Sequence, residues 1–273
     1  MPADTSQPVL RFERVSVSFD GVTALDDVSF QAVEGESRVI MGATGSGKTV
    51  LLKTALGLQR LDSGAVYVFG QEISRMPEQE LFPIRSRIGM LFQESALFDS
   101  LNIEENVSYP LLNQVCIHCP PGEVRPRVEE ALQFVELEGT LEKFPSELSG
   151  GMRRRAAIAR AVVTQPPLLL YDSPTAGLDP ITAETIMALV VKERDMNRST
   201  TLIVTYRYQD GNLVANFRYN PDNGRLEPAG KDGGASRTIF MVLREGRLIF
   251  EGTQAELEAS RDPYVSKFVK RRG

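Results

Sequence analysis

The sequence predicts one α/β domain that carries a helical insertion. Short alternating or continuous apolar runs, typical of strands, recur in both halves of the chain. A glycine-rich segment at residues 42–49 lies between one such run and a segment with helical spacing. Between about residues 96 and 161 the pattern is helical. A chain of 273 residues has room for one large or two small domains, and without an internal repeat we predict a single domain over residues 1–273.

Strand patterns dominate the first ninety or so residues. Leu10 to Phe19 (LRFERVSVSF) alternates between apolar and polar residues, as a strand with one buried face does. From Gly42 onward, GATGSGKTVLLKTALGL changes to apolar residues at helical spacing, so the local order is strand, glycine loop, helix. The remaining strands predicted here are Asp26 to Phe30, Ser37 to Met41, Gly64 to Gly70 and Arg87 to Phe92.

After the helical insertion, two buried strands flank a helix. The strands are Leu168 to Asp172 and Thr201 to Thr205. Asp179 is a good N-cap for the helix between them, with Pro180 in its first turn and one apolar face formed by Ile186, Leu189 and Val190.

We expect a C-terminal extension from about residue 211 to residue 273. Gly211 to Ser236 is rich in Gly, Asn, Asp and Pro, which predicts a loop or an irregular hairpin. TIFMVLREGRLIFEG predicts two strands around a Glu245-Gly246 turn. A short helix and a basic tail, Lys267 to Arg272, complete the chain.

Charge and hydropathy exclude several classes of protein. The balance of 31 basic against 36 acidic residues argues against a nucleic-acid partner bound by bulk positive charge. The start, MPADTSQPVL, lacks the basic and apolar regions of a secretory signal. No apolar run reaches the roughly 18 to 20 residues of a membrane span. We therefore expect a cytoplasmic chain that reaches a membrane only through a partner.

The segment CIHC places Cys116, His118 and Cys119 together. A zinc site is one interpretation, but no second ligand pair at a suitable spacing completes four ligands. Ordinary thiols in a reduced protein are the preferred interpretation. His118 is the one histidine of the chain, so no other position supplies an imidazole.

The glycine-rich segment matches the pattern G-x-x-x-x-G-K-[ST], after an apolar strand and at the start of a helix. Backbone N–H groups of such a loop surround phosphate oxygens, and the helix N-terminus favours negative charge. We therefore predict that the loop binds ATP, with Lys48 on the terminal phosphates and Thr49 and Asp172 on Mg²⁺. The alternative is a glycine turn that merely precedes a helix. The predicted loop residues are Gly42, Ala43, Thr44, Gly45, Ser46, Gly47, Lys48 and Thr49.

A second motif decides the class of nucleotide protein. LSGGM, residues 148–152, precedes a basic helix, RRRAAIARAV. With this motif the sequence resembles the ATP-binding subunits of ABC transporters, in which Gln usually stands in place of Met152. The resemblance implies a P-loop NTPase fold of ABC type, with a mixed sheet core, an N-terminal antiparallel β-subdomain and a helical subdomain. It also implies that Phe19 stacks on adenine, that Gln93 is the loop glutamine near Mg²⁺, and that 176–179 crosses a dimer interface.

The resemblance implies a composite site shared by two chains. Each ATP lies between the Lys48 loop of one chain and Ser149, Gly150 and Gly151 of the other, where further N–H donors face the phosphate. The pair is either a homodimer or a heterodimer of ATPase subunits.

A finer resemblance concerns ALFDSLNIEENVSYPL, residues 96–111. This segment is similar to the ATPases of Mla-type phospholipid transporters, as is LSGGMRRRAAIARA. The resemblance implies an integral membrane permease and an MCE-domain lipid-binding protein as partners, and a place on the inner face of the membrane. Residues after Gln93 would contact the permease, unless Phe98 and Leu101 are simply core residues. An importer of a small polar solute is the competing interpretation.

Two positions depart from the family pattern. Ser173 follows Asp172 where most members have a glutamate that acts as base or orients water, and a hydroxyl is a poor base near neutral pH. Tyr206 stands where members have a histidine that contacts the γ-phosphate. The chain is then either a slow ATPase or an ATP-binding clamp, which in a heterodimer would complete its partner's site. An engineered or erroneous residue at position 173 is a further explanation, but it would not account for the second departure, at Tyr206.

Overall fold

A computed structural model of the chain describes residues 8–114, 116–229 and 237–270. The last residues of the predicted basic tail (271–273) and of the predicted loop (230–236) lie outside these residues, as does the segment before Pro8. The main sheet has the strand order β12-β11-β3-β8-β7-β6. Its parallel strands are β3 (Ser37–Met41), β6 (Ile88–Leu91), β7 (Leu168–Asp172), β8 (Thr200–Thr205) and β11 (Thr238–Arg244).

β12 (Arg247–Gly252) runs antiparallel to β11, so the sheet is mixed, as predicted. Every residue of β3, β7 and β8 is buried, which explains the consecutive apolar residues inside each of these strands. The glycine loop follows β3, and helix α1 (Lys48–Ala55) begins within this loop's last residues.

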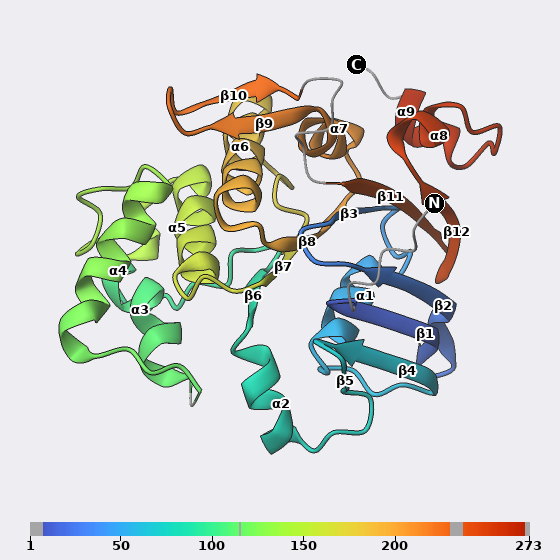
Figure 1. Cartoon of the computed structure of the whole chain (residues 1–273), viewed down its shortest axis with the longest axis horizontal. Coiled ribbons are helices and arrows are strands. Elements are labelled where there is room, and N and C mark those ends of the chain that lie inside the picture. Colours follow the sequence, from blue (N-terminus) through green and yellow to red (C-terminus); the bar gives the residue numbers. More distant parts are fainter. Residues whose placement is uncertain (1–7, 115, 230–236, 271–273) are drawn as a thin grey trace.

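A second sheet packs beside the first and confirms the predicted N-terminal antiparallel unit (Figure 1). β1 (Leu10–Phe19) pairs with both β2 (Val22–Ala32) and β4 (Ser63–Val68), and β5 (Gln71–Glu72) pairs with β4. Its apolar face shares a core with α1 and with one side of the main sheet. The short helix α2 (Glu78–Arg85), which was not among the predicted elements, leads from this sheet to β6.

The predicted helical insertion contains α3 (Ile103–Asn113), α4 (Pro121–Phe134), the 3-10 turn η1 (Pro145–Glu147) and α5 (Gly150–Val162). These helices lie at the opposite end of the molecule from the antiparallel sheet (Figure 1). They share a core with β7 and with α6 (Pro180–Asn197). Asp179 caps α6 as predicted, because its carboxylate accepts hydrogen bonds from the N–H groups of Ile181 and Thr182.

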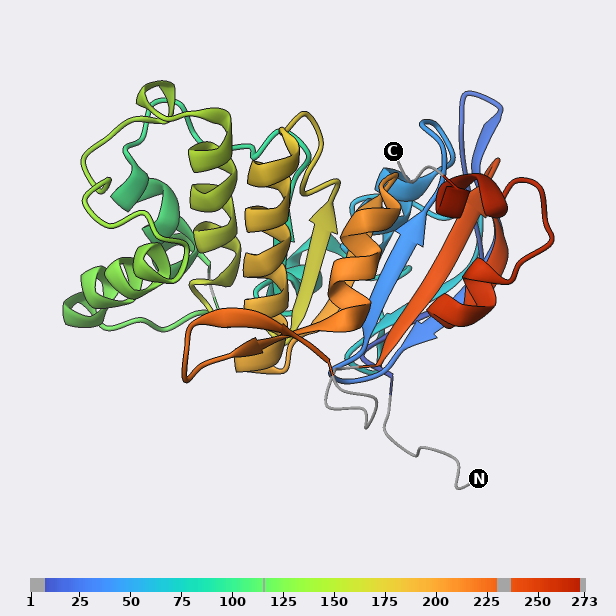
Figure 2. The ribbon, with the colours of Figure 1, turned by 90° about the horizontal axis from the view of Figure 1, so that it is seen from above.

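The segment after β8 corrects one prediction. Helix α7 (Tyr208–Asn216) occupies the start of the expected loop, so Gly211 lies inside a helix. The irregular hairpin predicted after it is present as β9 (Phe217–Asn220) and β10 (Arg225–Pro228). This hairpin packs across one end of α6 (Figures 1 and 2).

The C-terminal hairpin of β11 and β12 turns at Glu245-Gly246, as predicted. It is followed by α8 (Gln254–Glu258) and α9 (Ser266–Lys270). Among the described helices, none has the length and apolar character that crossing a membrane requires. Cys116 and Cys119 are both free thiols.

Candidate functional site

The carboxyl ends of four adjacent parallel strands bring the predicted catalytic residues to one edge of the main sheet. β3, β8, β7 and β6 lie side by side in that order. They are followed by the glycine loop, Tyr206, Ser173 and, two residues beyond β6, Gln93. Ligands of open α/β sheets bind at this edge, because loops and helix N-termini meet there.

The glycine loop has the backbone geometry of a phosphate cradle. Gly47, with φ of 99°, caps the N-terminus of α1, and a Cβ there would lie 2.2 Å from the Ala24 carbonyl oxygen. A Cβ on Gly42 would lie 2.4 Å from Ser46 Oγ and 2.6 Å from the Leu243 carbonyl oxygen. The loop can therefore adopt this close turn only with glycine at both positions. The N–H groups of the first turn of α1 have no intrahelical acceptors and suit an anion.

Lys48 is folded into the cradle. Its Nζ donates to the carbonyl oxygens of Gly42 and Ala43, each at 2.8 Å, and the side chain is buried. Burial lowers the pKa of this ammonium below its ordinary value, and the Asp172 carboxylate opposes the lowering. Helix α1, which begins at Lys48, packs against β7, the strand that ends at Asp172. A polyphosphate would give the buried ammonium the anionic partner that the carbonyls only partly replace.

Asp172 and Ser173 form a buried polar pair at the end of β7. Asp172 is 2% exposed and Ser173 is 9% exposed. Ser173 Oγ donates to Asp172 Oδ1 at 3.2 Å, and Ser173 N donates to the Val204 carbonyl at 2.8 Å. With φ of 51°, Ser173 holds a backbone conformation that is costly for a residue with a Cβ. The Thr49 hydroxyl and the Asp172 carboxylate are the hard oxygen donors that Mg²⁺ prefers.

Tyr206, Gln93 and Phe19 are exposed at the surface. Tyr206 is 47% exposed directly after β8, and Phe19 is 43% exposed at the end of β1. The Gln93 side chain is also exposed, whereas its backbone carbonyl accepts a hydrogen bond from the Arg154 guanidinium. All three side chains are therefore accessible to a bound molecule.

The signature segment lies apart from the glycine loop. Ser149 caps α5, and its Oγ accepts a hydrogen bond from Met152 N at 3.2 Å. A groove of about 570 Å³ is lined by 149–152 and by residues between Gly177 and Ile186, and by no residue of the glycine loop. Gly151 packs so closely that a Cβ would lie 2.7 Å from Thr182 Cγ2. This separation within one chain agrees with a site completed by a second chain.

Sequence reasoning missed residues that brace the site from distant parts of the chain. Tyr264, before α9, accepts a hydrogen bond from the Ala43 N–H at 3.1 Å. The buried Asp210 carboxylate accepts from Thr175 Oγ1 at 2.7 Å and from Thr205 Oγ1 at 2.6 Å. It thereby joins the segments that follow β7 and β8. Their separation in sequence left no local pattern to find.

A sequence model of the family described as ABC transporter matches residues 25–176 of the chain. The chain belongs to the ABC transporter family. Curated relatives include the intermembrane phospholipid transport system ATP-binding protein MlaF of Haemophilus influenzae. That protein is 33% identical over 90% of this chain and 84% of its own length.

Other relatives of this ABC ATPase are named for the transport of small solutes. The probable ribonucleotide transport ATP-binding protein mkl of Mycobacterium leprae is 34% identical over 93% of this chain and 67% of its own. The methionine import ATP-binding protein MetN of Mesorhizobium japonicum is 37% identical over 83% of this chain, which spans 61% of that relative.

Solved structures agree with the ABC cassette fold. The cassette MJ0796, in a dimeric post-hydrolysis state bound to ADP and Pi, is similar with a TM-score of 0.74 and 30% identity, covering 89% of this chain and 98% of that one. CbiO1 from Clostridium perfringens has a TM-score of 0.75 and 27% identity, covering 97% and 93%. As a member of this family, the chain is an ATP-binding ATPase subunit that forms dimers and works with a membrane permease.

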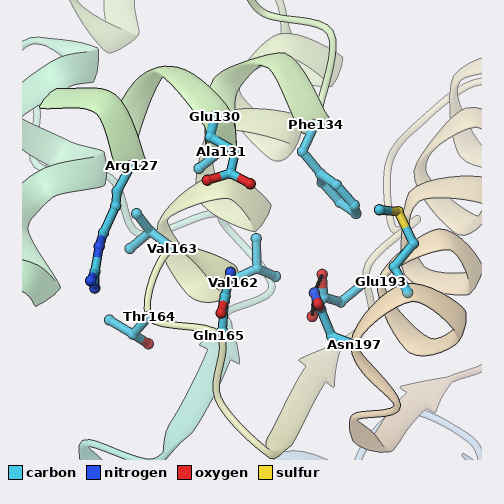
Figure 3. Close-up of a pocket in the computed structure, with 11 residues that line it drawn as sticks. Arg127, Glu130, Ala131, Phe134, Val162, Val163, Thr164, Gln165, Glu193 and Asn197 are labelled. Atoms are coloured by element: carbon cyan, nitrogen blue, oxygen red, sulfur yellow. Dashed lines mark hydrogen bonds between the residues drawn. The ribbon is translucent and has the colours of Figure 1, made fainter. Parts of the chain in front are cut away.

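A pocket outside the nucleotide site contains a strongly perturbed acid. The cavity, of about 240 Å³, lies between α4, the end of α5 and α6 (Figure 3). Glu193, on the α6 wall, is 1% exposed, and its two carboxylate oxygens accept from Asn197 Nδ2 at 2.9 Å each. Burial raises the pKa of Glu193 to about 7, against the opposing effects of Asn197 and Lys192.

We expect Glu193→Gln to stabilise the ABC ATPase at alkaline pH. The folded chain holds the Glu193 proton to about pH 7, whereas an unfolded glutamate loses it near pH 4.3. The folded state therefore binds more protons between these values, and the wild-type free energy of unfolding falls as pH rises through them. The substitution removes this penalty. Urea unfolding should show a gain of about 3 kcal/mol at pH 8 that shrinks below about 1 kcal/mol at pH 5.

A matched control is Glu130→Gln, which changes an exposed carboxylate of the same pocket. It should leave the free energy of unfolding nearly unchanged at both pH values. An equal gain from Glu193→Gln at pH 5 and pH 8 would contradict the titration of Glu193.

Proposed function

We propose that this chain is the ATP-binding subunit of an ABC transporter that moves phospholipid between membranes. The observation that carries the proposal is the similarity to the phospholipid-transport protein MlaF, which extends over 90% of this chain and 84% of that relative. The methionine-import relatives are more identical, but this chain spans little more than three fifths of their length. Residues 96–111 are the segment whose sequence most resembles Mla-type ATPases.

We infer that the permease docks beside the loop that follows Gln93. Phe98 and Tyr109 are each 41% exposed, with ring centroids 4.7 Å apart, and Leu112 is 62% exposed. Adjacent exposed aromatic and aliphatic side chains are typical of a protein interface. Phe98 is thus partly available to a partner, although the sequence also allowed a core position. The transporter would include an MCE-domain lipid-binding protein and hold the ATPase at the cytoplasmic face of the membrane.

We infer the following roles at the nucleotide site. The glycine loop, residues 42–49, holds the phosphates through backbone N–H groups and the Lys48 ammonium. Thr49, Asp172 and Gln93 hold Mg²⁺, which when bound neutralises charge on the phosphates. Phe19 offers its exposed ring to the base. Ser149, Gly150 and Gly151 complete the site of the partner subunit. Ser173 stands at the position whose side chain would orient the attacking water. Tyr206 stands at the position whose side chain would contact the γ-phosphate.

A second function is favoured by Ser173 itself. Its hydroxyl donates to Asp172, and no carboxylate stands at this position to accept a proton from water. In a heterodimer, this chain would then hold ATP at its own Lys48 loop and supply Ser149 to a faster site on its partner. In a homodimer both sites would be slow.

Reconstitution tests the transport proposal. In vesicles that contain the chain and its permease, we expect ATP-dependent transfer of a fluorescent phospholipid, with ATP turnover several-fold above that of the isolated chain. A Phe98→Ala, Tyr109→Ala variant should bind ATP normally and lose this stimulation. Stimulation by methionine or a ribonucleotide, with no lipid transfer, would instead indicate a small-solute importer.

A further inference from the structure

Arg154 connects the segments that follow β6 and β7. It lies in the first turns of α5 and is 6% exposed. One guanidinium nitrogen, Nη1, donates to the Phe92 carbonyl at 3.1 Å and to the Gln93 carbonyl. The other, Nη2, donates to the Ala176 carbonyl at 3.4 Å. A single side chain thus spans the Gln93 loop and the segment just beyond Ser173.

A guanidinium is better suited than any other side chain to link two backbone segments through their carbonyl groups. It is planar and offers its donors in a fixed fork, so it can bind carbonyls on two different segments at once. The Asp172 carboxylate lies near enough to oppose the lowering of the Arg154 pKa that burial causes. Arg154 therefore holds both loops and also interacts electrostatically with Asp172.

The segment from 173 to 176 is fixed at its other side as well. Ser173 N donates to the Val204 carbonyl of β8, and Thr175 is tied through Asp210 to Thr205. Ala176 N donates to the Ser173 carbonyl at 3.0 Å, which closes the turn. A displacement of the Gln93 loop would therefore displace this turn too, because Arg154 is hydrogen-bonded to both.

We propose that Arg154 is a positioning residue of the ATPase, which holds the Gln93 loop and the turn at residues 173–176 as one unit. It acts through the backbone carbonyls of Phe92, Gln93 and Ala176. It sets where Gln93 and Ser173 stand relative to Asp172, and where the segment 176–179 meets a second copy of the chain. This role is independent of the transported molecule.

The test separates nucleotide affinity from turnover and dimerisation. For purified Arg154→Gln, ATP affinity should stay within about threefold, because the glycine loop is untouched. The kcat should fall about 10- to 100-fold, since small displacements of reacting groups have effects of this size. The ATP-dependent dimer, measured by light scattering, should weaken in parallel. Arg154→Lys keeps the charge but loses the fork, so it should recover only part of both losses.

Arg160→Gln is the matched control. Arg160 lies on the same helix and donates to the carbonyls of Ser95 and Ala96, beyond Gln93, without reaching Ala176. It should leave the basal kcat and the ATP-dependent dimer near wild type. A folded Arg154→Gln protein with unchanged kcat and dimerisation would overturn the proposal. An equal loss in Arg160→Gln would also overturn it. Fixing the loop after Gln93 would then be enough for activity, and a link to the turn at residues 173–176 would not be needed.

Discussion

Replacing Lys48 with alanine is expected to remove ATP binding, with a loss in affinity of at least about 100-fold, or about 3 kcal/mol. The Lys48 ammonium is buried, and its present acceptors are the carbonyls of Gly42 and Ala43 inside the loop. A charge-assisted bond to phosphate in such a place is far stronger than one in water. Calorimetric titration of ATP into the purified variant measures the loss.

Lys53→Ala is the control for this experiment. Lys53 lies in the last turn of the same helix, α1, and outside the glycine loop. We expect its affinity for ATP to remain close to that of the wild type. Unchanged affinity in Lys48→Ala would mean that the loop does not hold the phosphates, and ATP binding through residues 42–49 would have to be abandoned.

The local order of strand, glycine loop and helix could be predicted because each part depends on neighbouring residues. The pattern changes from the short strand Ser37–Met41, which ends in three apolar residues, to helical spacing after Lys48, and glycines stand where the backbone turns. The α/β class followed for the same reason, whereas the ABC type of the fold was implied by the resemblance at residues 148–152. Even the cap of α6 by Asp179 is a contact between near neighbours.

The sequence does not predict helix α7, because Gly211 and the polar residues after it are typical of a loop. Gly211 is instead required by packing, since a Cβ there would lie 2.6 Å from Phe240 Cε1 and 2.9 Å from Val39 Cγ1. The helix must approach the main sheet this closely after Tyr206. Such a requirement arises from strands distant in sequence, so composition within residues 211–216 could not show it.

The contacts that brace the site were equally invisible in the sequence. Arg154 reaches the Gln93 carbonyl across 61 residues, and Tyr264 reaches Ala43 across 221. Arg154 stands in a run of arginines whose members have different partners: Arg153 donates to Leu148 and Arg155 to Val135. Only the fold distinguishes the arginine that braces the site from those that hold the helical region together.

Replacing Ser173 with glutamate is expected to raise ATP turnover by about 10²-fold or more, within the range that a positioned general base contributes. The side chain at position 173 starts beside Asp172, in a site that is 9% exposed. A second carboxylate there would have a raised pKa, because burial and the neighbouring negative charge both disfavour its ionised form. It would then accept a proton near neutral pH, as serine cannot.

Ser173→Gln separates basicity from size in this experiment. Glutamine has the shape of glutamate and can orient water, but it cannot take up a proton. Steady-state phosphate release should therefore rise in Ser173→Glu and stay near wild type in Ser173→Gln. Equal gains in both would assign the defect to water orientation. No gain in either, with ATP binding intact, would contradict a missing base as the limiting factor. Tyr206 would then be the next position to change, because a neutral, 47% exposed phenol replaces the usual imidazole there.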